Sequence, residues 1–95
     1  MKFYNGNNID KQGRISLGGL VDPNTKVEIW VDEKDFTLIH VKRYLELKDD
    51  VPEYGIHMTD SKSRVVIPKA LRGNAVRALI ASDMHNGGIV LKLVE

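Results

Sequence analysis

Two short clusters in the sequence place an arginine four positions after an aspartate, and the second cluster opens a strongly basic segment. Asp60 precedes Arg64, and Asp60 is the single acid in a segment with five basic residues: Lys62, Arg64, Lys69, Arg72 and Arg77. Lysine and arginine neutralise phosphates, and an arginine can donate two hydrogen bonds to O6 and N7 of guanine. An aspartate at a turn accepts backbone N–H groups or orients a nearby arginine. The segment therefore predicts DNA contacts from its basic residues and a structural turn at Asp60.

The first cluster is a weaker form of the same pattern. Asp10 precedes Arg14, with Lys11 and Gly13 between them, and a glycine there is free to adopt a positive φ. By the same chemistry we expect Arg14 and Lys11 to contact DNA and Asp10 to stabilise the turn. The alternative interpretation is that the basic side chains of both clusters form a solvated face or pair with acids elsewhere in the chain.

The elements that must position these clusters are mostly short strands, because apolar and polar residues alternate with a period of two. We expect a weak, short strand within the first nine residues that ends at Asp10, and further strands at 14–17, 26–31, 36–43, 56–59, 64–67, 77–82 and 89–94. Polar hairpin loops are expected at 32–35 and 83–88. Proline is well suited to the first turn of a helix. We therefore expect a short helix from Pro68 to Val76, interrupted or capped near Gly73.

The two clusters belong to a weak internal repeat with an offset of fifty residues. Asp10 aligns with Asp60 and Arg14 with Arg64, and the aligned apolar pairs are Ile15/Val65, Leu17/Ile67, Ile29/Leu79 and Val41/Leu91. Half of this chain is too short to close a core alone. We therefore expect one domain, 1–95, in which halves 1–45 and 51–95 pack about a pseudo-twofold axis and are joined by a linker at about 46–53. Chance similarity between short β-rich segments is the alternative.

Composition and charge exclude several classes of protein. With 95 residues, 42% of them hydrophobic, the chain can form one domain with a modest core. The absence of cysteine excludes disulfides and a thiolate nucleophile, and it is compatible with the cytoplasm. No apolar run approaches the ~18–20 residues of a membrane span, so no membrane partner is expected. Residues 28–60 have a net charge of −5 and residues 61–95 of +4, which predicts separate faces for an anion and for another partner.

The other residues capable of chemistry do not form a recognisable active site. His40, His57 and His85 fall on different expected elements without metal-ligand spacing, so no metal is expected. The sequence has neither a nucleophile elbow nor a phosphate-binding glycine loop, and we expect no enzymatic activity and no cofactor. Trp30 and Tyr44 occupy otherwise polar positions and are expected to be exposed, with Trp30 in an interface between halves or chains.

The second cluster resembles the N-terminal motif of the AbrB/MazE/SpoVT swapped-hairpin family. The matching residues are Asp60-x-x-x-Arg64-Val65-Val66-Ile67-Pro68-Lys69-x-Leu71-Arg72. The segment from Asp10 to Leu17, with the hairpin that begins near Val27, is similar to the same motif. Two copies in one chain are similar to the layout of MraZ proteins, which are longer members of the superfamily. The resemblance covers nearly the whole chain.

The resemblance implies a mainly β, AbrB-like barrel built from two interlocked repeats, with a short helix after the second motif. Members of the family are mostly DNA-binding transcription regulators, or antitoxins that regulate their own operons, and their exposed arginines meet DNA. Carried over by position, that role falls first on Arg14 and Arg64 and then on Lys62, Lys69 and Arg72.

Two departures from the family pattern make the copies unequal. Gly18 stands where the family has proline, and the Leu-Arg pair that follows is missing, which predicts a shortened or lost helix in the first copy. Ser63 stands where the family usually has glycine. We therefore expect the two DNA-contacting sites to differ.

Two functional hypotheses follow. The leading one is a small cytoplasmic transcription regulator that binds double-stranded DNA. The alternative is a protein-binding module on the same fold, antitoxin-like or an inhibitor of a host factor, that uses the acidic segment from Glu28 to Glu53. If the two copies complete one barrel, the monomer is expected to fold alone, and a homodimer is then optional.

Overall fold

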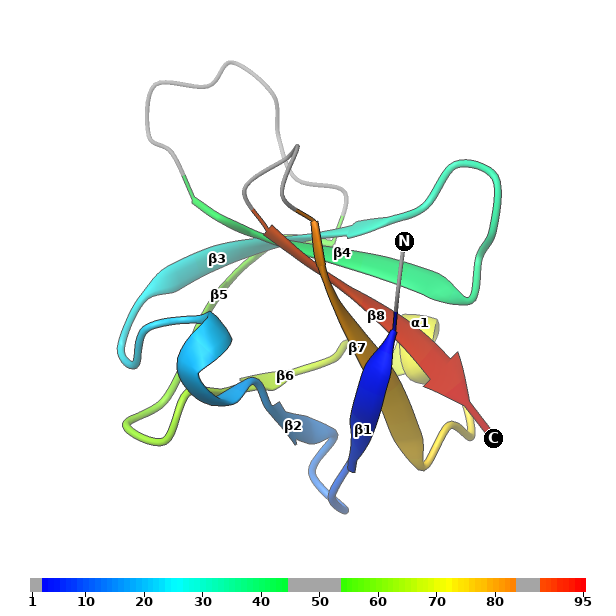
Figure 1. The fold of residues 1–95 in the computed structure, drawn as a ribbon, viewed down its shortest axis with the longest axis horizontal. Coiled ribbons are helices and arrows are strands. Elements are labelled where there is room, and N and C mark those ends of the chain that lie inside the picture. Colours follow the sequence, from blue (N-terminus) through cyan, green and yellow to red (C-terminus); the bar gives the residue numbers. More distant parts are fainter. Residues whose placement is uncertain (1–2, 45–53, 84–87) are drawn as a thin grey trace.

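The structure is a computed structural model of the chain and describes residues 3–44, 54–83 and 88–95 (Figure 1). The strands in these residues are β1 (Tyr4–Asn8), β2 (Arg14–Ser16), β3 (Lys26–Val31), β4 (Leu38–Arg43), β5 (Ile56–Met58), β6 (Arg64–Val66), β7 (Arg77–Asp83) and β8 (Gly88–Val94). The helices are the 3₁₀ helix η1 (Gly18–Leu20) and the α-helix α1 (Lys69–Arg72). The expected mainly β fold, with a short helix after the second cluster, is confirmed.

Six of the strands form one antiparallel sheet with the order β1-β7-β8-β4-β3-β5. At its centre, β4 and β8 pair His40 with Val90 and Ile39 with Leu91. The edge strand β1 pairs with β7, and the opposite edge strand β5 pairs with β3. Strands from the first and from the second half of the chain are therefore interleaved within a single sheet.

The strands β2 and β6 form a second, two-stranded antiparallel sheet in which Ile15 lies opposite Val65. β2 lies against β1, and β6 lies against β5, so the small sheet spans the space between the two edges of the large one (Figure 1). The side chain of Asn7 joins β1 to β2 by donating a hydrogen bond to the carbonyl of Ser16 at 2.6 Å.

The hydrophobic core draws on both sheets and on both parts of the chain. Fully burying a Val, Leu or Ile side chain stabilises the folded state by about 1.5–3 kcal/mol. The residues of the core cluster are Ile15, Leu17, Val27, Ile29, Ile39, Val41, Val65, Ile67, Ala78, Ile80, Ile89 and Leu91. Because β2 and β6 contribute to this cluster, burial of their inner faces also holds the two basic clusters in place.

Several elements are shorter than the sequence predicts, and for two of them, β4 and α1, the local cause is visible. Strand β4 begins at Leu38 rather than Phe36, because the Asp35 side chain holds Thr37 in the turn by accepting from its N–H at 2.9 Å and its hydroxyl at 2.6 Å. Helix α1 ends at Arg72 and is followed by Gly73, whose φ of 51° is readily adopted only by glycine. The expected capping at this glycine is confirmed.

The outer face of β3 is less exposed than the alternation of its residues predicts. Glu28 has no exposed surface, and Trp30 is half-buried. The indole Nε1–H of Trp30 donates a hydrogen bond to Oε1 of Glu28 at 3.1 Å. A carboxylate can be buried when it is hydrogen-bonded, so the polar character of Glu28 does not require exposure. Tyr44, also expected to be exposed, is half-buried.

The core face of β7 is shifted by one residue from the fifty-residue alignment. That alignment matches Ile29 with Leu79, but Leu79 is half-buried, whereas Ala78 and Ile80 belong to the core. Ile80 lies opposite Leu91 in the pairing of β7 with β8. Ile80, rather than Leu79, therefore occupies the core position on β7. The predicted linker at about 46–53 and the central part of the predicted loop 83–88 lie outside the described residues.

Candidate nucleic-acid interface

The first cluster forms a turn that is held together by the carboxylate of Asp10. Its Oδ1 accepts hydrogen bonds from the N–H groups of Gln12 and Arg14, each at 2.9 Å. Its Oδ2 accepts from Nε–H of the Arg14 side chain at 2.7 Å. One carboxylate therefore closes the turn and also orients the arginine, as its type and spacing predict.

The second cluster makes the same set of contacts. Oδ1 of Asp60 accepts from the N–H groups of Lys62 and Arg64, each at 2.9 Å. Oδ2 of Asp60 accepts from Nε–H of Arg64 at 2.6 Å. The structural turn roles predicted for both aspartates are thus found in the geometry of both loops.

Both turns require a residue with a positive φ just before the arginine. Gly13 has a φ of 81°, and Ser63 has a φ of 57°. This conformation is uncommon for a residue with a side chain, so Ser63 departs from the preference for glycine there. Its side chain is buried. At Gly13 there is no room for a side chain, because a Cβ would lie 2.5 Å from Nε of Arg72.

The hydrogen bonds lower the pKa of both carboxyl groups. The pKa of Asp60 falls from 3.8 to about 2, chiefly because of the backbone N–H of Arg64, with contributions from the Arg64 side chain and the backbone N–H of Lys62. The pKa of Asp10 is lowered for the same reasons, with the backbone N–H of Arg14 as the largest cause. Both loops therefore keep ionised carboxylates throughout the physiological pH range.

The lowered pKa of Asp60 predicts a loss of stability in acid. A carboxyl group with a depressed folded-state pKa stabilises the protein above its unfolded-state pKa, and this contribution is lost as pH falls through the folded-state pKa. For Asp60 the window extends from 3.8 down to about 2. In Asp60→Asn, we expect proton uptake on unfolding at about pH 3 to fall by slightly less than one proton. The pH dependence of the thermal unfolding temperature, measured for both proteins, checks this; equal slopes between pH 4 and 2 would contradict it.

The pairing of β2 with β6 brings the two arginines onto one surface. Arg14 lies opposite Val66, and Ser16 lies opposite Arg64. Opposed residues in an antiparallel ladder point to the same face, and alternate residues share a face. Because the intervening pair, Ile15 and Val65, belongs to the core, both arginines are on the outer face. Their side chains are 31% and 29% exposed, respectively.

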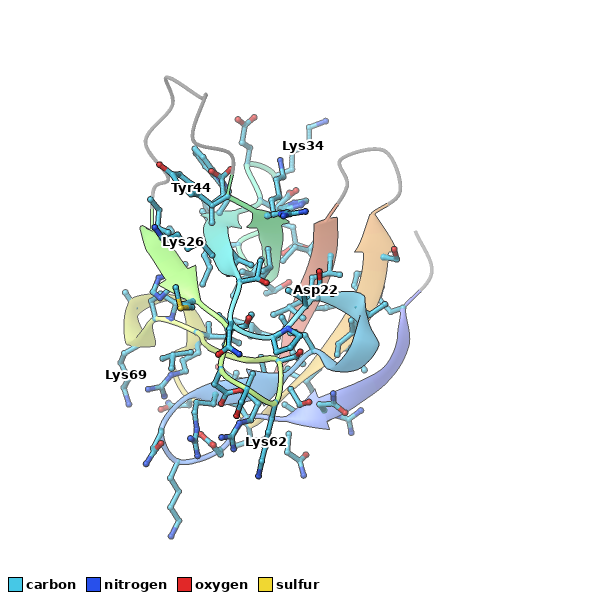
Figure 2. The ribbon with its side chains drawn as sticks, turned by 90° about the vertical axis from the view of Figure 1, so that its left-hand side faces the viewer. Asp22, Lys26, Lys34, Tyr44, Lys62 and Lys69 are labelled. Atoms are coloured by element: carbon cyan, nitrogen blue, oxygen red, sulfur yellow. The ribbon has the colours of Figure 1, made fainter. Side chains whose placement is uncertain are left out.

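The remaining predicted basic residues lie around this face, on the two loops, on α1 and at the start of β7. Lys11 and Lys62 are exposed in the two loops. Arg72 joins the first loop to α1, because it lies against Gly13 and its Nε–H donates to the carbonyl of Ile67 at 3.0 Å. In Figure 2, Lys62 lies at the end of the molecule opposite Lys34.

Lys69 and Arg77 complete the predicted set but are less directly connected to the two loops. Lys69 is exposed on α1, and Figure 2 shows it on the side of the same half of the molecule as Lys62. Arg77 is exposed at the start of β7, where it lies opposite Asn8 of β1. Of the seven predicted basic residues, the loops and the β2–β6 pairing bring together Lys11, Arg14, Lys62 and Arg64.

Three residues of the outer face were not assigned a role from the sequence. Val66 is 42% exposed between the two arginines, Ser16 lies beside it, and Gln12 is exposed in the first loop. The alternation of residues in the short strands places Ser16 and Val66 outside. The alternation does not indicate, however, that these two strands pair with each other.

The structure describes four of the eight acids between Glu28 and Glu53, and three of these four make internal contacts. Oδ1 of Asp32 lies 2.9 Å from Nε2 of His40, and its Oδ2 accepts from the N–H groups of Lys34 and Asp35. The His40 contact is the main reason that the pKa of Asp32 is lowered. Glu28 is buried, and Asp32 and Asp35 stabilise the turn. Within the described residues, the exposed acid of this segment is therefore Glu33.

No other arrangement in the described residues indicates a reactive centre. Within the ranges 3–44, 54–83 and 88–95, no three His, Cys, Asp or Glu side chains gather in a way that could hold a metal ion. His57 contacts the carbonyl of Tyr54 through Nε2 at 2.8 Å, and His85 lies outside the described residues. None of the helices within those ranges has the length and apolar character needed to cross a membrane.

Comparison of the chain with protein-family models, with curated proteins and with solved structures finds no match. The functional interpretation therefore depends on the geometry of the two loops and of the surface they form.

Proposed function

We propose that this protein is a small cytoplasmic DNA-binding transcription regulator with an AbrB-like swapped-hairpin fold. The observation that most supports this is the matching geometry of the two Asp-x-x-x-Arg loops, which orient Arg14 and Arg64 on the outer face of one two-stranded sheet. In this proposal the loops and α1 contact double-stranded DNA, and the six-stranded sheet serves as their scaffold.

The internal repeat is part of the proposal, and the pairing of the strands supports it. The pairs Ile15–Val65 and His40–Val90, each fifty residues apart, lie at the centres of their ladders. Exchange of β1 with β5, β3 with β7 and β4 with β8 leaves the order of the large sheet unchanged. In each proposed repeat the first strand pairs with the hairpin of the other repeat. This exchange is what a swapped-hairpin barrel with a pseudo-twofold axis requires.

The loops suit DNA because they position each guanidinium before binding. In both loops Nε–H is directed to a carboxylate, and within the described residues no further hydrogen bond of Arg14 or Arg64 side chains is found. The four Nη–H donors of each arginine are therefore available for a phosphate or for a guanine edge. An arginine that is already oriented loses less conformational freedom on binding, which favours affinity.

The two loops offer different side chains to DNA. The first loop has Lys11 and Gln12, whereas the second has Ser61 and Lys62 and is followed by Lys69 on α1. The proposed sites are therefore unequal, and we expect the second loop to contribute more phosphate contacts. A DNA site without strict twofold symmetry fits this arrangement.

Fluorescence anisotropy with mixed-sequence and AT-rich duplexes at about 50 and 200 mM salt tests the proposal. We expect binding that weakens steeply with salt, and we expect Arg64→Ala to reduce the slope of log K against log salt by about 0.9, the value for one phosphate contact. Lys34→Ala removes the same charge at the opposite end of the molecule and is the matched control (Figure 2). Absence of binding at low salt by the folded protein, or equal losses in both variants, would reject the proposal.

The acidic segment is less favoured as the functional surface because three of its four described acids, Glu28, Asp32 and Asp35, make internal contacts. Reversal of charge at Glu33, which is exposed, separates the two hypotheses without disturbing the turn that Asp32 stabilises. Under the DNA hypothesis Glu33→Lys leaves DNA affinity unchanged or slightly higher, because it removes a negative charge. If Glu33→Lys abolishes the cellular activity of the protein while Arg64→Ala leaves that activity intact, a protein partner would be favoured.

A further inference from the structure

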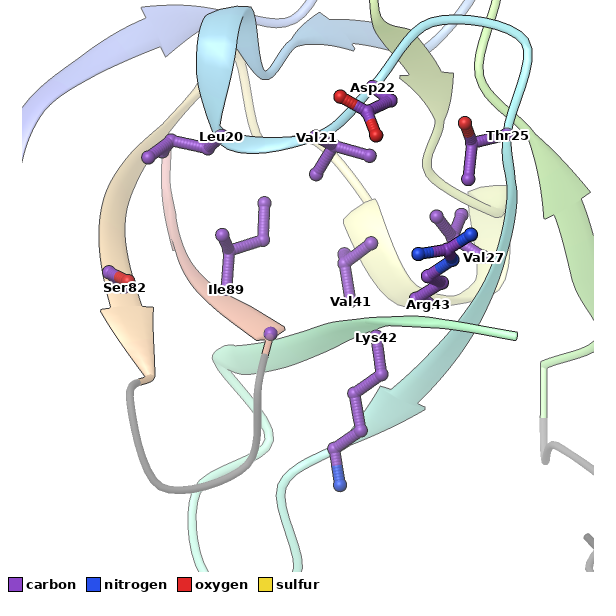
Figure 3. A pocket seen from close by; sticks show the side chains of 11 residues that line it. Leu20, Val21, Asp22, Thr25, Val27, Val41, Lys42, Arg43, Ser82 and Ile89 are labelled. Carbon is purple, nitrogen blue, oxygen red and sulfur yellow. The ribbon is translucent and has the colours of Figure 1, made fainter. Parts of the chain in front are cut away.

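A pocket of about 280 Å³ opens beside η1, over the part of the large sheet formed by β8, β4 and β3 (Figure 3). Four buried or half-buried apolar side chains form its floor: Val21, Val27, Val41 and Ile89. Three charged residues, Asp22, Lys42 and Arg43, also line it. The volume is near the lower limit of roughly 300–1,000 Å³ that is typical of ligand pockets, so it suits a small molecule.

The pocket lies where the two central strands differ in side-chain volume. In the proposed fifty-residue repeat, which has the pair His40–Val90 at the centre of the β4–β8 ladder, Val41 of β4 is equivalent to Leu91 of β8, and Arg43 is equivalent to Leu93. Leu91 is fully buried and Leu93 packs against the core, whereas Val41 is smaller. Arg43 therefore places a guanidinium on β4 where the equivalent position on β8 has the apolar side chain of Leu93.

The pocket presents one negative and one positive group above its apolar floor. Figure 3 shows the side chains of Asp22 and Arg43 beside Val21, Val27 and Val41, while Lys42 extends away from the pocket. Within the described residues, neither the Asp22 carboxylate nor the Arg43 guanidinium makes an ion pair or a hydrogen bond. Both residues are exposed, so a ligand can reach them without breaking a contact within the part of the chain that the structure describes.

The rim that holds Asp22 is fixed by a buried threonine. The hydroxyl of Thr59, which is 1% exposed, donates to the Asp22 carbonyl at 2.7 Å and accepts from the Thr25 N–H at 2.9 Å. The Thr59 N–H donates to the Thr25 carbonyl at 2.9 Å. The backbone around the pocket is thus held in place before any ligand arrives, which lowers the entropic cost of binding.

We propose that this pocket binds a small zwitterion of the apolar α-amino-acid class. The guanidinium of Arg43 pairs with the ligand carboxylate, for which its planar N–H fork is suited. The carboxylate of Asp22 pairs with the ligand ammonium, and the aliphatic side chain of the ligand covers the valine floor. The proposal is independent of DNA binding.

Leucine is the probe that tests the site. In a titration of the ¹⁵N-labelled full chain followed by NMR, we expect saturable shifts of the amide signals of Val21, Asp22, Val41 and Arg43. Isocaproate, which lacks the ammonium, and isoamylamine, which lacks the carboxylate, are each expected to bind about tenfold or more weakly, because each loses one charge-assisted contact. Absence of saturable shifts at these amides, or equal affinity for all three probes, overturns the proposal.

Neighbouring substitutions on β4 separate a direct contact from a general charge effect. Arg43→Ala is expected to weaken leucine binding about tenfold or more, whereas Lys42→Ala removes the same charge one residue away and is expected to leave it within about twofold. Val21→Leu with Val41→Leu fills the floor and is expected to abolish binding in a protein that remains folded by circular dichroism. Equal effects of Arg43→Ala and Lys42→Ala contradict the assignment, and so does unchanged binding in the folded double variant.

Discussion

Replacing both loop arginines, Arg14→Ala with Arg64→Ala, is expected to weaken binding to duplex DNA by about 100-fold or more. Each arginine provides charge-assisted hydrogen bonds worth about 1.5–3 kcal/mol, and each 1.4 kcal/mol corresponds to about a tenfold change in affinity. The two side chains lie on one outer face and are oriented by Asp10 and Asp60, so both are expected to contact the same duplex. Anisotropy titrations at constant salt measure the change.

One companion protein makes this result specific. Arg14→Lys with Arg64→Lys keeps both charges but loses the planar fork, so we expect the salt dependence to persist while preference among sequences declines. Circular dichroism establishes that each protein remains folded. An Arg14→Ala/Arg64→Ala protein that binds DNA as tightly as the unsubstituted chain would exclude the β2–β6 face as the DNA-binding surface.

Truncation in the centre of the core, Leu91→Ala, is expected to destabilise the protein by about 2–5 kcal/mol. Leu91 has no exposed surface and lies between Ile39 of β4 and Ile80 of β7. The loss is large for a domain of this size, whose total stability is expected to be about 5–15 kcal/mol. Urea unfolding followed by circular dichroism measures it.

A surface truncation provides the contrast for the core experiment. Phe36 is 78% exposed in the loop before β4, so Phe36→Ala is expected to change the stability by no more than about 0.5 kcal/mol. Similar destabilisation by Leu91→Ala and Phe36→Ala would mean that the contacts of β8 are not the main source of stability.

The local features of both loops could be predicted because they depend on residues close together in the chain. The spacing of Asp10 and Arg14, like that of Asp60 and Arg64, is short enough for one carboxylate to accept from the backbone and the side chain of the same arginine. Strand β3 begins and ends as predicted, because its alternation of apolar and polar residues is strong.

Several features could not be predicted because they depend on which strands become neighbours. Alternation classifies Glu28 as outward-facing, yet it is fully buried and hydrogen-bonded to Trp30. The ungapped fifty-residue alignment predicts that Leu79 lies in the core, but in the register of β7 with β8 it is Ile80 that lies there. Local pattern identifies a face of a strand, but it does not reveal what covers that face or where the register shifts.

The sequence by itself determined the residues of the candidate DNA surface, the two aspartate-centred turns and the mainly β character of the chain. Only the tertiary structure decided that Arg14 and Arg64 share a face, because β2 and β6 are three residues long and fifty residues apart. Only the tertiary structure placed Asp22 and Arg43 at one pocket, since they lie on different elements. The physical reason is that side-chain type and turn geometry depend on local chain chemistry, whereas pairing between distant strands depends on burial of a shared core.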